Sequence, residues 1–180
     1  MKVKEILNEI ITEVREVDYY TPIKVDFEEN DIKDKELFYY RVINPKSSFV
    51  EVSINSVTKK IVNITLVSVN DIEEKKPDML SLSEVVGNPV IDMSVFKKGH
   101  IVTDNAEFSI MTQNKELLIL QKNIDVCTSL IIDNTTLLLD TQNNIVGFVF
   151  KAFSEEEWRE LNEGIEAAVS IEETGIIKFD

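Results

Sequence analysis

The sequence predicts an α+β protein, with a mostly antiparallel sheet, an N-terminal amphipathic helix and a C-terminal helix packed on the sheet. Three observations indicate this class: helical spacing of apolar residues in the first segment, alternating apolar and polar residues in short central segments, and a helix-capping motif near the end. The 180 residues, 43% hydrophobic and 29% charged, have the composition of an ordinary globular chain.

Residues 3–17 are expected to form the first helix. Their apolar side chains recur at spacings of three and four, which places them on one face of a helix. They are Val3, Ile6, Leu7, Ile10, Ile11, Val14 and Val17. Pro22 ends this segment, because proline disfavours helical conformation in the residue before it.

The middle of the chain is expected to form strands. Residues 23–27 alternate apolar and polar side chains, and residues 37–43 are apolar on both faces. Residues 50–66 alternate on either side of a turn, which predicts a hairpin with one wet and one dry face. The pattern then loosens, and residues 80–86 are expected to form a short helix.

Further strands are expected after residue 100, separated by turns rich in Asn and Asp. They are 107–111, 116–121, 128–132, 135–139 and 145–153. Ser154 and Glu157 then form a capping box that opens the final helix. Residues 167–179 are expected to end the chain as a short strand.

The chain is expected to form a single α+β domain, 1–180, with sub-units 1–72 and 101–180 on either side of an irregular junction, 73–100. Residues 58–64 and 141–148 resemble each other, since each is a turn leading into a strand that begins Ile-Val. Either a duplication into two similar halves or a shared hairpin geometry explains this likeness.

The charge balance argues against several partners. The chain has 33 acidic and 19 basic residues and a net charge of −14, so it repels phosphate backbones and anionic lipid headgroups. We therefore expect no binding to nucleic acid or membrane. No signal-peptide pattern is present, which predicts a cytoplasmic protein with Cys127 reduced.

No pattern of residues predicts catalysis or a bound cofactor. A single Cys and a single His exclude a disulfide framework and a Cys/His zinc site within one chain. His100 and Cys127 lack the partners of a nucleophilic site, and the five glycines form no phosphate-binding loop. We expect no catalytic, cofactor-binding or metal-binding residues, and no enzyme activity.

The acidic residues concentrate in the last part of the chain, where residues 101–180 hold 15 acidic and 5 basic side chains. On the final helix, acidic residues lie opposite the apolar face and predict a docking surface for a basic protein. These candidate partner-binding residues are Glu155, Glu156, Glu160, Glu163 and Glu166. The alternative is that this helix face only keeps the protein soluble.

The chain resembles the bacterial immunity proteins that neutralise polymorphic or contact-dependent toxins. The features that carry the resemblance are the hairpin at 50–66, the strand-to-helix unit at 144–163 with its Ser154 cap, and the acidic surplus. The resemblance implies stoichiometric inhibition of a toxin domain, often a basic nuclease whose catalytic cleft is covered by acidic side chains. We expect no cofactor; the sequence does not determine the oligomeric state, and a monomer is favoured.

Other functions remain as alternatives. One is a dimeric, acidic, secretion-type chaperone that binds an extended segment of its client. Another is a small-ligand-binding domain or an enzyme that uses carboxylates, which would need convergent carboxylates with shifted pKa values in a pocket. A third is an accessory domain with no dedicated partner.

Overall fold

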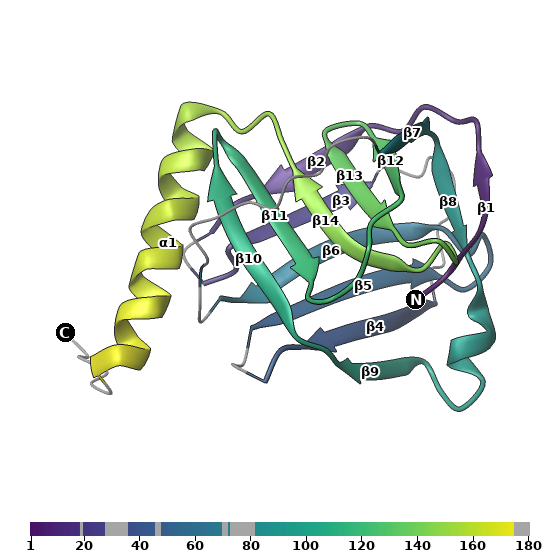
Figure 1. Cartoon of the computed structure of the whole chain (residues 1–180), viewed down its shortest axis with the longest axis horizontal. Helices are drawn as coiled ribbons and strands as arrows, with labels where there is room; N and C mark the ends of the chain where they lie inside the picture. Colours follow the sequence, from purple (N-terminus) through teal and green to yellow (C-terminus); the bar gives the residue numbers. More distant parts are fainter. Residues whose placement is uncertain (19, 28–35, 46–47, 70–71, 73–81, 175–180) are drawn as a thin grey trace.

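The computed structural model describes the chain except residues 19, 28–35, 46–47, 70–71, 73–81 and 175–180, and it describes only the backbone of residues 167–174. The described residues form the strands β1 to β14, the 3-10 helix η1 (Met93–Phe96) and the helix α1 (Glu155–Thr174). The protein is mostly β, so the predicted α+β class is wrong (Figure 1).

The first six-stranded sheet is antiparallel except at one edge, where β9 runs parallel to β4. Its strands, in spatial order, are β2 (Glu13–Glu16), β3 (Ile23–Phe27), β6 (Ile61–Ser68), β5 (Phe49–Asn55), β4 (Leu37–Ile43) and β9 (Ile101–Asn105). The strands predicted at 23–27 and 37–43 are confirmed, as is the hairpin predicted at 50–66.

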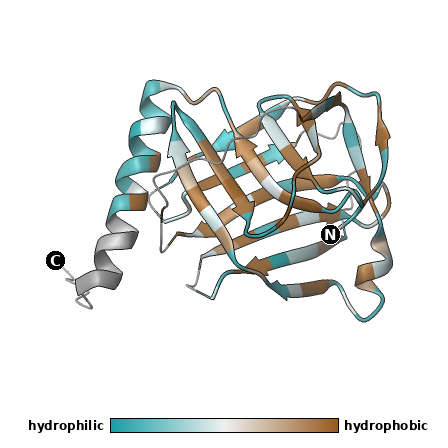
Figure 2. Cartoon of the chain, in the orientation of Figure 1, coloured by the Kyte–Doolittle hydropathy of each residue, from teal (hydrophilic) through white to brown (hydrophobic). Residues whose placement is uncertain are grey.

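The second six-stranded sheet repeats this arrangement, with β7 parallel to β12 at one edge. In spatial order its strands are β10 (Phe108–Gln113), β11 (Glu116–Gln121), β14 (Ile145–Phe150), β13 (Thr135–Leu139), β12 (Thr128–Ile132) and β7 (Ser83–Val86). One apolar core contains side chains of both sheets, which therefore pack face to face. Figure 2 shows the apolar residues concentrated in these strands.

The two sheets share their strand order and also their register. In the first sheet, the pairing of β5 with β6 shifts register immediately before the Ile54–Ile61 pair. In the second sheet, the pairing of β13 with β14 shifts immediately before the Leu139–Ile145 pair. The Ile-Val pairs noted in the sequence begin β6 and β14 at these two bulges. The likeness extends through both sheets, which a shared hairpin geometry alone does not require.

The turns before these two strands are built alike. Asn55 Oδ1 accepts hydrogen bonds from two backbone N–H groups of its turn, at 2.8 and 3.0 Å, and Asp140 Oδ1 accepts two at 2.8 Å. Lys59 and Asn143 hold equivalent left-handed positions, with φ of 61° and 63°. Each turn thus uses a short polar side chain to satisfy the amides that its tight geometry leaves unpaired.

A two-stranded sheet of β1 (Val3–Leu7) and β8 (Asn88–Ile91) joins these two turns at the end of the molecule opposite α1 (Figure 1). Val3 pairs with Ile91 at one end of this sheet. Val3 N–H donates to Asn143 O at 2.9 Å, and Ile91 N–H donates to Lys59 O at 2.8 Å. The contacts of the two strands are therefore reciprocal.

The predicted N-terminal helix at 3–17 is wrong, because this segment forms β1 and β2. Ile10, which the helix would have buried, is fully exposed, and Val14 is half exposed. The apolar residues of the segment are mainly Val and Ile, whose β-branched side chains favour strands. Pairing with β8 and β3 decided the conformation, and residue spacing does not reveal those partners.

Two further predictions need correction. The short helix predicted at 80–86 is wrong where the structure describes it, since Ser83–Val86 form β7. The strand predicted at 167–179 is wrong up to Thr174, because α1 continues through those residues. Of the expected junction, 82–99 carries β7, β8 and η1, whereas 73–81 lies outside the described residues.

The start of the final helix is as predicted. Glu157 N–H donates to Ser154 Oγ at 3.2 Å, and Ser154 N–H donates to Glu157 Oε2 at 2.7 Å. This reciprocal capping box satisfies two amides at the helix start. Leu161 and Ile165 are buried in the common core, so α1 is docked against one end of the two sheets (Figure 1).

Candidate functional site

An open acidic pocket of about 400 Å³ lies between the chain that leaves β2 and the exposed side of α1. Val17, Asp18 and Tyr20 form one wall, and Glu160 and Glu163 of α1 form the other. We call these five residues the acidic pocket. Three acidic residues from segments far apart in the sequence thus line one pocket, together with Tyr20, which is 85% exposed.

The structure separates the five acidic residues that the sequence grouped together. Glu160 and Glu163 line the acidic pocket, while Glu155 forms an ion pair with Lys115 in the β10–β11 turn. Glu156 and Glu166 are exposed on α1. Only part of the predicted acidic face therefore belongs to the pocket.

Asp18 and Tyr20 were not among the predicted binding residues. They lie in the segment that the sequence pattern indicates as a break after the first helix, and no charge cluster singles them out. Their position depends on β2 running along the edge of the first sheet, so that the following residues reach α1. The signal available in the sequence was a tyrosine two residues after an aspartate.

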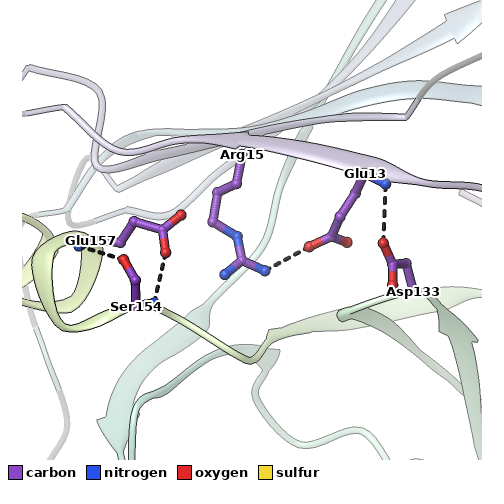
Figure 3. Close-up of polar contacts among 5 residues, drawn as sticks. All are labelled: Glu13, Arg15, Asp133, Ser154 and Glu157. Atoms are coloured by element: carbon purple, nitrogen blue, oxygen red, sulfur yellow. Dashed lines mark hydrogen bonds and ion pairs between the residues drawn. The ribbon is translucent and has the colours of Figure 1, made fainter.

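A buried ion pair lies on β2, the strand that precedes Val17 and Asp18 of the acidic pocket (Figure 3). Arg15 Nη2 lies 2.6 Å from Glu13 Oε1, and the two side chains are only 7% and 3% exposed. The Arg15 guanidinium also stacks over the Phe153 ring, 4.3 Å from its centroid. Phe153 immediately precedes the Ser154 cap, so Arg15 connects β2 to the start of α1.

The same cluster holds β2 against the second sheet. Glu13 N–H donates to Asp133 Oδ2 at 3.2 Å, across to the turn between β12 and β13. Glu13 Oε2, Arg15 Nε and the nearby Thr135 Oγ1 are buried without a well-formed hydrogen bond. Burial raises the pKa of the Glu13 carboxyl above its usual 4.5, against the opposing influence of Thr135 and Arg15.

A second polar pocket, of about 250 Å³, opens beside the N-terminus and contains Tyr40, Asp104 and Asp140. Tyr40 donates its hydroxyl proton to Asp104, and burial together with this bond raises the pKa of the phenol. Burial alone would raise the pKa of Asp140, but hydrogen bonds from Asn144 and Gln142 outweigh it and hold the pKa below its usual value. Both carboxylates are therefore engaged within the protein.

The sequence candidates for nucleophilic chemistry are not assembled into a site. His100 Nδ1 lies 3.4 Å from Glu36 Oε1, and its ring lies beside Phe38 with 4.6 Å between centroids and an interplanar angle of 52°. Cys127 is half-buried just before β12, where its carbonyl accepts a backbone hydrogen bond from Ser83. Among the described residues, no group of three His, Cys, Asp or Glu side chains is arranged to hold a metal ion.

No protein-family model matches the chain, and no curated protein matches its sequence. Within the described part of the chain, no helix is long and apolar enough to cross a membrane. Function is therefore inferred from the geometry of the protein itself.

Proposed function

We propose that this protein is a cytoplasmic, protein-binding inhibitor that uses the acidic pocket to hold basic side chains of its partner. The supporting observation is that Asp18, Glu160 and Glu163 line one open pocket together with the exposed Tyr20. An arginine suits this arrangement, because its guanidinium can bind carboxylates and stack on an aromatic face at the same time. The net charge of −14 would speed encounter with a basic partner.

The partner class that we propose is a toxin domain, most plausibly a basic nuclease that the protein neutralises. An acidic surface that occupies the phosphate-binding cleft of a nuclease would block its substrate without any chemistry in the inhibitor.

Charge reversal on opposite parts of α1 tests the pocket. The pocket variant is Glu160→Lys/Glu163→Lys, and the control Glu155→Lys/Glu156→Lys changes the net charge equally outside it. The probe is a fluorescein-labelled hexa-arginine peptide, measured by anisotropy at about 0.05 M and about 0.5 M salt. Two unit charges about 5 Å apart attract by about 1–3 kcal/mol at effective dielectric constants of about 80 to 20.

We expect the pocket variant to bind the probe at least about tenfold more weakly at low salt, and the control to lose much less. Equal losses in both variants would show that only the overall charge matters. The inhibitor role is tested on the neighbouring reading frames: a basic C-terminal domain encoded there should be a nuclease, and its activity should fall to zero at a one-to-one ratio. Full nuclease activity in the presence of excess protein would refute the role.

A further inference from the structure

The Glu13–Arg15 ion pair lies between the strand that leads into the acidic pocket and the residue that precedes the cap of α1. On one side, β2 ends at Glu16, and Val17 and Asp18 of the pocket follow directly in the chain. On the other, the Arg15 guanidinium lies on Phe153, which also packs against Trp158 of α1 with 5.5 Å between ring centroids. Arg15 thus links the strand that precedes one wall of the pocket to Phe153, which packs on the helix that carries the other wall.

The other half of the chain shows that packing does not require charges at these positions. In the first sheet, Arg15 pairs with Val25, which pairs with Ile64. In the second, Ile110 pairs with Ile119, which pairs with Phe148.

The same registers make Phe108 equivalent to Glu13. Phe108 begins β10 two residues before Ile110, as Glu13 begins β2 two residues before Arg15. Phe108 and Ile110 are 3% and 1% exposed, so the same sheet position is filled there by ordinary core residues. Apolar residues in the second sheet therefore fill the positions that Glu13 and Arg15 occupy in the first sheet.

The ion pair is also a poor source of stability. Removing two charges from water is costly, and apolar residues of similar volume often stabilise a protein as much as a buried pair. Here the cost is not fully offset, because Glu13 Oε2 and Arg15 Nε lack well-formed hydrogen bonds. The pair provides interactions of fixed direction, which two apolar side chains do not: the ion pair between Arg15 and Glu13, and the stacking of the Arg15 guanidinium on the Phe153 ring.

We infer that Glu13 and Arg15 are positioning residues, which set the distance between the two walls of the acidic pocket and hold Asp18 opposite Glu160. This inference rests on the proposed role of the pocket in binding basic side chains. It assigns the charged pair to partner recognition instead of fold stability.

The test replaces the pair with the residues of the other half, as Glu13→Phe/Arg15→Ile. The control, Lys24→Gln/Asp26→Asn, removes an ion pair of 2.7 Å that is partly exposed on the neighbouring strand β3. Three quantities are measured: the midpoint of thermal unfolding, acrylamide quenching of Trp158, which is the only tryptophan, and affinity for hexa-arginine. Trp158 quenching reports directly on the packing of the helix wall.

We expect the double variant to unfold within about 5 °C of the wild type or above it, while Trp158 becomes more accessible and affinity falls about tenfold. The control should leave quenching and affinity unchanged. Glu13→Gln is the second variant, since it removes the charge at nearly constant volume and should weaken affinity in the same direction. Wild-type affinity and quenching in the double variant would overturn the inference, as would a double variant that does not fold.

The two proposals fail in different ways. If the wild type does not bind hexa-arginine, the proposed pocket function is refuted. Trp158 quenching in the double variant then still shows whether the pair positions α1.

Discussion

Gly147, in the centre of β14, tests the packing of the second sheet. It pairs with Leu120 of β11 and with Leu138 of β13. A Cβ at this position would lie 2.5 Å from the Ile119 carbonyl oxygen and 3.1 Å from the Cδ1 atoms of both leucines. The leucine side chains can shift, but the carbonyl can move only if β11 moves with it.

Gly147→Ala should therefore be destabilising although alanine is larger by only one methyl group. Overpacking of this kind costs about 1–3 kcal/mol, and weakening one ladder hydrogen bond adds about 0.5–1.5 kcal/mol. We expect a total loss of about 2–4 kcal/mol. For a chain of this size that lowers the unfolding midpoint by roughly 5–15 °C.

The assay is urea denaturation followed by far-ultraviolet circular dichroism and by Trp158 emission. Asn63 holds the equivalent position in the first sheet, where it pairs with Ser53 and already carries a Cβ. Asn63→Ala is therefore the control and should change stability by less than about 1 kcal/mol. If Gly147→Ala were as stable as the wild type, the pairing of β11 with β14 in this register would be wrong.

Three other changes test α1 and the buried pair. Ser154→Ala removes the hydroxyl that caps Glu157 N–H and should cost about 1 kcal/mol in urea titrations; no loss would mean that the cap does not form in solution. Leu161→Ala opens a cavity at a side chain with no exposed surface and should cost about 2–5 kcal/mol, with increased Trp158 quenching; a loss below about 1 kcal/mol would contradict the docking of α1. Burial raises the pKa of Glu13, so the folded state holds the carboxyl proton more tightly than the unfolded state. The free energy of unfolding of the wild type, relative to that of Glu13→Gln, should therefore fall as the pH rises from 4.5 through the pKa of the folded state. A relative stability that rises over that range would show that the carboxyl is not buried.

Most of the strands were predictable because their pattern is local. The segments 116–121, 128–132 and 135–139 have the predicted bounds, and Asn or Asp residues close the turns between them. Alternation of apolar and polar residues, and short side chains that satisfy turn amides, are properties of neighbouring residues. The capping box at Ser154 and Glu157 was predictable for the same reason.

The candidate site was only partly predictable. Charge and helix periodicity identified Glu160 and Glu163, but they also selected Glu155, which pairs with Lys115 instead. Asp18 and Tyr20 join the pocket through the course of β2, which the helix predicted for residues 3–17 obscured. Sequence pattern also gave no sign that Glu13 and Arg15 are buried, because alternating charged residues on a short segment normally face water.

By itself, the amino-acid sequence determined the strongly acidic charge, most of the strands and turns, and the start of the final helix, since each follows from composition or from residues close together in the chain. Only the tertiary structure decided that residues 3–17 form two strands, that both sheets share one register, and that Asp18 and Glu160 line one pocket. Strand pairing and burial depend on partners distant in sequence, and their energy exceeds the weak local preference for a helix.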